Sequence, residues 1–200
     1  RIRALAEEAG RTIMRIFHDG FDVESKSDAT PVTDADHASE AVILPALAAL
    51  TPGIPVISEE RDAQGNSPDA SDGTFWAVDP LDGTREFIDR LPGFSVNIGL
   101  IRNLKPVFGV LHGPATGVTY WTEGPDRAMR AEAGANGTPI TTRATPGEGP
   151  TLITSRSHGK GRRLTDYLAE VRVVHHIQEG SALKFGRLAE GDADIYPRFG

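Results

Sequence analysis

Two aspartates three residues apart are the strongest candidates for chemistry in this sequence. Asp79 follows the apolar run 75–78, and Asp82 stands directly before Gly83. We expect the run to be a strand ending at Asp79, followed by a turn that Pro80 stiffens and that aims both carboxylates to one side. Gly83 permits unusual backbone angles and a close approach by a ligand. Such carboxylates suit a hard divalent cation, because Mg²⁺ requires oxygen ligands in octahedral geometry.

Further carboxylates are needed, because two aspartates alone provide too few oxygen ligands. Glu59 and Glu60 follow the apolar run 54–57, and strand ends gather on the ligand side of an α/β sheet. Asp34 and Asp36 form another acidic pair. The ordinary alternatives are a solvated D-x-x-D turn, surface acids and a helix cap at Asp34. Because the acids stand at the boundaries of expected elements, the pattern favours a metal site.

The elements that position these groups follow from hydrophobic periodicity. The β-then-α/β order predicts a layered mixed fold of two subdomains. Residues 1–140 would form an α+β subdomain with most metal ligands, and 141–200 an incomplete α/β subdomain for substrate recognition. We expect polar turns over 19–33, loops over 61–74 and 134–150, helices over 2–17, 36–50 (capped by Thr33 or Asp34 and kinked at Pro45), 160–169 and 181–190, and strands over 54–57, 75–78, 94–102, 106–112, 117–122, 151–154, 171–177 and 193–197.

The composition excludes several other classes of protein. The chain is 38% hydrophobic and 24% charged, as in ordinary globular proteins, and its net charge of −7 argues against binding a nucleic acid polymer. With no cysteine, it has neither disulfides nor thiolate chemistry, and a cytoplasmic setting is expected. No apolar run approaches a membrane span, and no signal peptide is evident. His175 and His176 lie in an apolar run, where a strand is expected rather than catalysis.

The run Trp76-Ala-Val-Asp-Pro-Leu-Asp-Gly-Thr84 resembles the W-x-[VI]-D-P-[LI]-D-G-T signature of the inositol-monophosphatase superfamily. The resemblance covers nearly the whole chain and is greatest for the 3'(2'),5'-bisphosphate nucleotidase branch. It implies an α+β fold, a layered αβαβα sandwich of the inositol-phosphatase/sugar-phosphatase type. The other segments that carry it are Pro31-Val-Thr-Asp-Ala-Asp36, Ile57-Ser-Glu-Glu60, Asp79-Pro-Leu-Asp-Gly-Thr-Arg-Glu-Phe-Ile88, Gly180-Ser-Ala-Leu-Lys-Phe185, Ala189-Glu-Gly191 and Tyr196-Pro-Arg-Phe-Gly200.

The resemblance implies a role for each acid of the candidate metal site. Glu59 would bind a metal ion and orient the attacking water. Asp79 and Asp82 would bind metals, with Asp82 shared, and the Leu81 carbonyl would complete one shell. Asp36 matches an outer acid beside a weaker ion, so two or three Mg²⁺ ions are implied. Asp34 matches no ligand position, which leaves a helix cap as its expected role.

The resemblance also implies substrate contacts. Arg198 falls where inositol-specific members place an acid that binds sugar hydroxyls, so its guanidinium would favour a second anionic group. The alternative is a surface cation beside Asp192 or Asp194. Lys184, near the start of an expected helix, would assist Arg198. The implied catalytic residues are Glu59, Asp82 and Thr84, and the implied substrate-binding residues are Glu59, Leu81, Asp82, Gly83, Thr84, Gly180, Ser181, Lys184 and Arg198.

The activity implied is Mg²⁺-dependent removal of the 3'-phosphate of 3'-phosphoadenosine 5'-phosphate, in sulfur assimilation or nucleotide recycling. Water would attack in line, without a phosphoenzyme. Two alternatives stay open: a phosphatase for inositol phosphate, histidinol phosphate or fructose bisphosphate, and a non-catalytic phosphate- or metal-binding module. A homodimer is a further possibility. The superfamily places another metal-binding Asp in a W-D-x-A-A-like motif beyond the position of Gly200, so we expect the chain to be a fragment that lacks this ligand.

Overall fold

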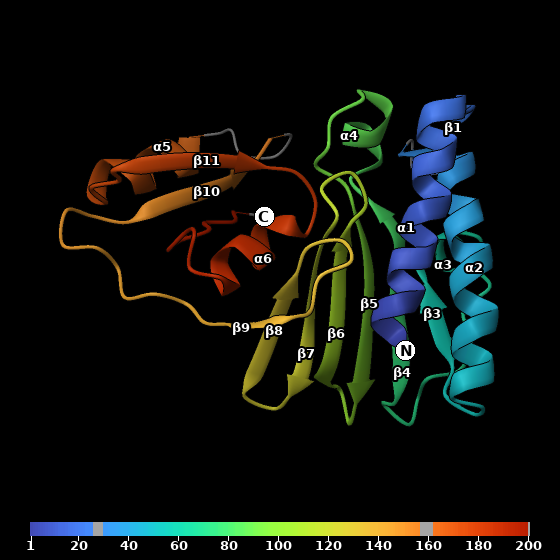
Figure 1. Cartoon of the computed structure of the whole chain (residues 1–200). Coiled ribbons are helices and arrows are strands. Elements are labelled where there is room, and N and C mark those ends of the chain that lie inside the picture. The colour runs from blue at the N-terminus through green and yellow to red at the C-terminus, as the bar shows by residue number, and fades with distance from the viewer. Residues whose placement is uncertain (26–29, 157–161, 200) are drawn as a thin grey trace.

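Two long helices cover one face of a large sheet in the computed structural model (Figure 1). The structure describes residues 1–25, 30–156 and 162–199. Helix α1 (Ile2–Asp19) buries a stripe that includes Ala6, Ala9 and Ile13, and helix α2 (Asp34–Leu50) buries Ile43 and Leu47. Their spacing is that of one helix face, so these side chains form a core against the sheet. The predicted helices over 2–17 and 36–50 are confirmed.

The large sheet has seven strands, and they follow one another in space as in sequence. Only β3 and β4 run parallel, and each later strand is antiparallel to the one before it. Along β5, Val96, Ile98 and Leu100 alternate into the helix-covered core. The strands are β3 (Val56–Ser58), β4 (Phe75–Asp82), β5 (Ser95–Arg102), β6 (Lys105–Gly113), β7 (Val118–Gly124), β8 (Arg127–Ala131) and β9 (Thr138–Ile140), and the short helices α3 (Glu59–Ala63) and α4 (Thr84–Ile88) follow β3 and β4.

A second, smaller layer lies on the side of the large sheet away from α1 and α2 (Figure 1). It contains a parallel pair of strands, β10 (Thr151–Ser155) and β11 (His175–Glu179). The helices of this layer are α5 (Arg162–Glu170) and α6 (Leu183–Ala189). The predicted α+β fold, in which mixed sheets and helices form layers, is confirmed. No helix in the described parts of the chain is long and apolar enough to cross a membrane.

Several predicted boundaries of strands and loops differ from those in the structure. The 134–150 loop contains β9, whose residues are mostly exposed and so give no apolar pattern, and β8 was not predicted. The predicted strand 171–177 is β11, shifted toward the C-terminus. The predicted strand 193–197 is a single bridge between Ile195 and Leu152, because the neighbouring Asp194 side chain takes the Thr151 N–H instead.

The polar segment 19–33 contains a short antiparallel pair, β1 (Val23–Ser25) and β2 (Pro31–Thr33). Positions 26–29 of that segment, and positions 160 and 161 of the predicted helix 160–169, lie outside the described residues. The strand role expected for His175 and His176 is confirmed, with His176 Nε2 2.8 Å from Thr154 Oγ1.

Candidate metal and phosphate site

A β-bulge places Asp79 and Asp82 on the same face of the large sheet. Asp79 pairs with Asn97 and Asp82 pairs with Ser95, so β4 advances three residues while β5 advances two. In a regular strand, residues three apart point to opposite faces, and one extra residue restores them to the same face. Pro80 occupies the bulge, where a missing N–H is tolerated. The prediction that the strand ends at Asp79 is therefore wrong, because β4 continues to Asp82.

The turn after β4 depends on Gly83. Its φ of 91° is left-handed, and it is the N-cap of α4. An added Cβ would lie 3.0 Å from the Gly93 carbonyl oxygen and 3.3 Å from Ser181 Cβ, so only glycine fits without displacing a neighbour. Thr84 begins α4, and its hydroxyl lies 3.2 Å from the Leu81 carbonyl oxygen. The turn thus holds the Thr84 hydroxyl over the aspartate face of the bulge.

Asp36 links the start of α2 to Thr84. Its Oδ2 accepts hydrogen bonds from the Thr33 backbone N–H at 2.8 Å and from the Thr33 hydroxyl at 2.7 Å, while Thr84 Oγ1 lies 3.3 Å from its Oδ1. Thr33 and Asp36 form a capping box, so Thr33 is the N-cap of α2. The expected cap at Asp34 is wrong: its carboxylate accepts the Asp22 N–H instead, at 3.1 Å.

Glu59 and Glu60 begin α3 directly after β3. Because β3 runs parallel to β4 and Ser58 pairs with Val78, Glu59 leaves its strand beside Asp79. Glu59 is exposed on the cavity side, whereas the Glu60 side chain is buried. Of the two glutamates, the fold therefore brings only Glu59 to the aspartates.

The loop before α6 closes the site from the other side. Ala182 N–H donates a 2.5 Å hydrogen bond to Asp82 Oδ2, and Asn97 Nδ2 lies 3.4 Å from the same oxygen. The buried Lys184 ammonium donates to the Ser181 carbonyl and lies 5.7 Å from the Tyr196 ring centroid. This loop carries Gly180 and Ser181, which are expected to contact substrate, and it brings a backbone donor to Asp82, while Lys184 in the first turn of α6 brings a cation.

The carboxylates at the bulge carry more negative charge than this environment stabilises. Burial, and then the charges of Asp82 and Glu59, raise the pKa of Asp79 to about 9. Burial also raises the pKa of Asp82, although the Ala182 N–H and the Lys184 charge act in the opposite direction. Asp79 is thus protonated at neutral pH unless a cation replaces the proton.

A complete set of metal ligands is not preformed. Within the described residues, no three His, Asp or Glu side chains are arranged to hold a metal ion as they stand. The neighbouring acids nevertheless raise the pKa of Asp79, because charge repulsion acts over several ångströms, whereas Mg²⁺ needs oxygens at about 2.0–2.1 Å. Clustered carboxylates whose charge is only partly compensated, as by Lys184, fit a hard divalent cation.

Glu59, Asp82, Thr84 and residues of the loop before α6 line one cavity of about 670 Å³. Arg198 lies at its rim, exposed, with Nη1 3.3 Å from the Tyr196 hydroxyl oxygen. The acids considered as its partners pair elsewhere, Asp192 with Arg187 and Asp194 with Arg143. The cavity residues are Thr30, Pro31, Glu59, Asp82, Gly83, Thr84, Arg85, Glu86, Ser155, Ser181, Ala182, Lys184, Phe185, Tyr196 and Arg198.

Some expected site residues lie beside this cavity rather than in its wall. Gly180 is buried, and an added Cβ would overlap the Gly93 carbonyl oxygen, so it packs two loops together. Leu81 is also buried and meets Thr84 through its carbonyl. Asp36 lies behind Thr84 and contacts it as described above.

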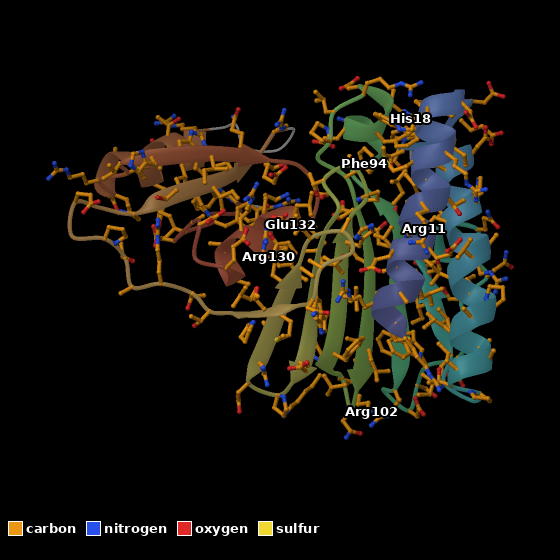
Figure 2. All side chains as sticks on the ribbon, in the orientation of Figure 1. Arg11, His18, Phe94, Arg102, Arg130 and Glu132 are labelled. Carbon is orange, nitrogen blue, oxygen red and sulfur yellow. The ribbon has the colours of Figure 1, made fainter. Side chains whose placement is uncertain are left out.

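Glu190, directly after α6, fixes this helix to the large sheet. Its carboxylate accepts a 2.8 Å hydrogen bond from the Tyr120 hydroxyl and forms an ion pair with Arg130 Nε at 2.7 Å. Figure 2 shows Arg130 and Glu132 beside α6. Burial, reinforced by Glu190, raises the pKa of Tyr120, so its hydroxyl remains a donor. Because α6 carries Lys184, this network positions a cation of the site.

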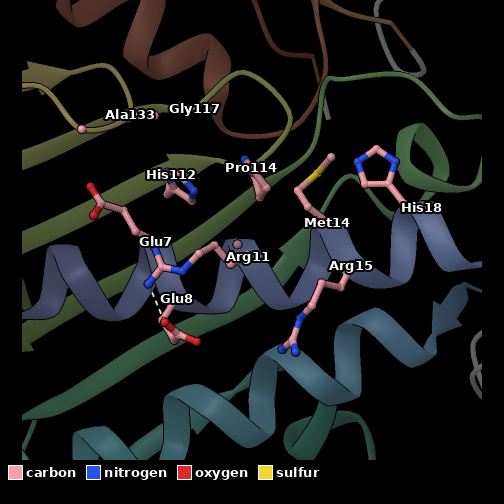
Figure 3. Close-up of a pocket in the computed structure, with 12 residues that line it drawn as sticks. Glu7, Glu8, Arg11, Met14, Arg15, His18, His112, Pro114, Gly117 and Ala133 are labelled. Carbon is pink, nitrogen blue, oxygen red and sulfur yellow. Dashed lines mark hydrogen bonds and ion pairs between the residues drawn. The ribbon is translucent and has the colours of Figure 1, made fainter.

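Two further cavities of similar size are formed by the described residues. One, of about 580 Å³, is formed by α1 together with Gly117, Ala133 and the end of β6, and it includes Arg11 and His112 (Figure 3). It contains none of the predicted site residues. The other, of about 650 Å³, extends from Glu59 and Asp79 across the sheet face opposite α1 and α2. Among the cavities formed by the described residues, the 670 Å³ cavity brings Asp82 together with the loop before α6 and Arg198, whereas Asp79 lines the 650 Å³ cavity beside it.

Known proteins match this chain both in sequence and in structure. The profile of the inositol monophosphatase family matches residues 2–200. The 3'(2'),5'-bisphosphate nucleotidase CysQ of Escherichia coli O157:H7 is 43% identical over 199 residues, covering 98% of this chain and 78% of that protein. CysQ from Bacteroides thetaiotaomicron superposes with a TM-score of 0.74 at 32% identity, over 98% of this chain and 77% of that one. Mycobacterium tuberculosis SuhB gives 0.75 at 25% identity, over 99% and 75%.

This chain therefore belongs to the inositol monophosphatase family, and it is an enzyme of the phosphatase type. The expected fold is confirmed by the structural matches. Among its relatives in sequence are proteins named as 3'(2'),5'-bisphosphate nucleotidases, the branch that the sequence most resembles.

Proposed function

We propose that this protein is a Mg²⁺-dependent phosphomonoesterase that removes the 3'-phosphate of 3'-phosphoadenosine 5'-phosphate, in sulfur assimilation or nucleotide recycling. The observation that carries the proposal is the position of Arg198 in the same cavity as Asp82 and Thr84. An arginine at the rim favours a substrate with a second anionic group, because guanidinium binds phosphate through paired hydrogen bonds. The relatives named as bisphosphate nucleotidases support the same choice.

The acids of the bulge would hold the metal ions. Glu59, Asp79, Asp82 and the Leu81 carbonyl oxygen would bind two Mg²⁺ ions, and Asp36 would be the outer acid of a third. Bound Mg²⁺ supplies positive charge to the phosphate and lowers the pKa of the attacking water. All the proposed donors are oxygens, as Mg²⁺ prefers.

The groups around the ions would orient the water and the phosphate. The Thr84 hydroxyl has one proton, which the Leu81 carbonyl or Asp36 Oδ1 can accept, so its lone pairs remain for a water molecule. Glu59, exposed to the cavity, would help to orient that water. The Gly83 and Thr84 N–H groups, with Ser181, would hold the scissile phosphate, and Lys184 and Arg198 the second one. Gly180 would act through its backbone, which lets the loop approach Gly93.

The test is a comparison of initial rates on 3'-phosphoadenosine 5'-phosphate and on inositol 1-phosphate, each with Mg²⁺ and with EDTA. We expect the nucleotide to be preferred by kcat/KM and EDTA to remove the activity. Adenosine 5'-phosphate is the control for position, because it lacks a 3'-phosphate and should not be hydrolysed. Preference for inositol phosphate would contradict the nucleotide substrate and favour the alternative of another monoesterase, such as one for histidinol phosphate or fructose bisphosphate.

A non-catalytic phosphate- or metal-binding module is the candidate of another class. The intact set of Glu59, Asp79, Asp82 and Thr84 favours an enzyme. Calorimetry that showed Mg²⁺ binding, together with no turnover of any phosphomonoester, would favour the module.

Three further properties belong to the proposal. A division near residue 140 would separate the seven-stranded sheet from the layer that carries β10, β11 and α6. A homodimer is expected to elute at twice the monomer mass in size-exclusion chromatography with light scattering. The cytoplasmic location is tested by cell fractionation.

A further inference from the structure

Phe185 and Tyr196 form an apolar wall in the cavity that holds Asp82 and Thr84. Their ring centroids lie 5.6 Å apart with an interplanar angle of 85°, an edge-to-face pair. Phe185 is 57% exposed, although Leu183, Lys184 and Gly186 beside it on α6 are all buried. A large aromatic ring is therefore held open to solvent inside the cavity that contains Asp82, Lys184 and Arg198.

Tyr196 connects this wall to the cationic part of the cavity. Arg198 Nη1 lies 3.3 Å from the Tyr196 hydroxyl oxygen, and the Lys184 ammonium lies 5.7 Å from the Tyr196 ring centroid. The tyrosine is thus held between the two proposed phosphate-binding cations and the ring of Phe185. A ligand that places an anionic group near Arg198 would have its next portion beside the Phe185 ring.

We propose that Phe185, supported by Tyr196, stacks on the nucleobase of the substrate and makes the site selective for nucleotides. The assignment rests on the proposed function. In a nucleoside bisphosphate, one ribose carries a flat base and two phosphates, which match the ring of Phe185, the Arg198 guanidinium and the bulge at Asp82. Stacking on an aromatic side chain tolerates any base, because each base has a π-face. Phe185 is a specificity residue and takes no part in bond breaking.

The alternative for Phe185 is a purely apolar role. Phe185 also lines the cavity along the open face of the large sheet, so any apolar cover on that face would contact it. An apolar role needs only bulk, whereas stacking needs an aromatic plane. Replacement by leucine and by tryptophan separates the two.

The experiment measures kcat and KM for wild type, Phe185→Leu, Phe185→Trp and Phe185→Ala on two substrates. One is 3'-phosphoadenosine 5'-phosphate, and the other is ribose 3,5-bisphosphate, which carries the same phosphates without a base. We expect Phe185→Leu and Phe185→Ala to raise KM for the nucleotide about tenfold with little change in kcat. Phe185→Trp should retain the wild-type KM, and no variant should change KM for ribose bisphosphate by more than about twofold.

Phe199→Ala is the matched control, because Phe199 is 45% exposed and its ring packs on Tyr167 outside the cavity, with centroids 5.9 Å apart. It should leave both substrates unaffected. Equal losses on the two substrates in Phe185→Leu, or wild-type kinetics in Phe185→Leu, would overturn the assignment while leaving the proposed function standing. If wild type hydrolyses no nucleoside bisphosphate, the proposed function fails and the assignment fails with it.

Discussion

The backbone N–H of Ala182 donates a 2.5 Å hydrogen bond to Oδ2 of Asp82, which is 100 residues away in the sequence. This contact joins the bulge of β4 to the loop before α6. The loop leads directly into Lys184 in the first turn of α6, whose ammonium donates to the Ser181 carbonyl and whose charge acts on Asp82. The proposed metal-binding and substrate-binding residues are therefore mechanically connected, and a change on either side is expected to affect the other.

Asp82→Asn should abolish hydrolysis while preserving the fold. The amide keeps the shape of the carboxylate but removes the charge that a metal ion would need. Loss of an outer-shell partner of a metal already costs about 10–100-fold, so loss of a ligand should cost more than about 100-fold in kcat/KM. Circular dichroism should be unchanged. Asp126→Asn, at an exposed turn residue between β7 and β8, is the control, and near-normal turnover in Asp82→Asn would refute the assignment.

The stability of the metal-free protein should decrease as the pH rises. The pKa of Asp79 is raised from 3.8 to about 9, so the folded state holds a proton that the unfolded chain releases. The stabilisation is complete below about pH 4 and is lost as the pH rises through 9. Thermal unfolding in EDTA should show Tm falling across this range, and Asp79→Asn should flatten the fall. Mg²⁺ should raise Tm more at pH 9 than at pH 6; an equal effect at both would contradict displacement of the proton.

Arg198→Ala should weaken binding only of substrates with a second phosphate. A hydrogen bond to a charged group contributes about 1.5–3 kcal/mol, so KM for 3'-phosphoadenosine 5'-phosphate should rise at least about tenfold. Hydrolysis of inositol 1-phosphate should change little. Arg102→Ala is the control, because Arg102 ends β5 at the opposite end of the sheet from the site (Figure 2). A loss of the same size on both substrates would show that Arg198 holds the fold or the scissile phosphate instead.

Gly180→Ala should impair both stability and activity. The new methyl group would overlap the Gly93 carbonyl oxygen, so the loop before α6 must move and Ala182 must withdraw from Asp82. Overpacking of this kind costs about 1–3 kcal/mol of unfolding free energy. Gly147→Ala, where an added Cβ meets nothing within 4 Å, should have neither effect. Denaturant unfolding measures the stability, and kcat/KM measures the activity. Normal activity in Gly180→Ala would mean that catalysis does not require this position of the loop.

His112 should make the fold sensitive to acid. It is buried beside Thr119, 2.8 Å from Nδ1 to Oγ1, and burial lowers its pKa from 6.5 to about 4. A depressed folded-state pKa contributes stability above pH 6.5 that is lost as the pH falls through 4. The loss should be about 3 kcal/mol. His112→Gln should remove this dependence of stability on pH, whereas His18→Gln, at an exposed residue of α1, should not remove it. If the stability of His112→Gln still falls in acid by the same amount, groups other than His112 cause the pH dependence.

The sequence by itself determined the local features of the site. The apolar runs before Glu59 and Asp79 predicted two strands, since a buried strand needs apolar side chains whatever surrounds it, although β4 continues past Asp79 to Asp82. Gly83 and Thr84 predicted the tight turn, because a left-handed φ is nearly free only for glycine. Short elements with exposed residues, such as β8 and β9, escaped prediction because they carry no periodic pattern.

Tertiary structure alone decided that Asp79 and Asp82 lie on the same face of the sheet, and which group donates a hydrogen bond to Asp82. The bulge at Pro80 is a property of pairing with β5, and no spacing within β4 reveals how far β5 advances beside it. Likewise, Ala182 reaches Asp82 through its backbone N–H, a donor that almost every residue type has and that side-chain chemistry cannot single out. The sequence supplied the ligand types, and long-range packing set their directions, because direction depends on partners distant in the chain.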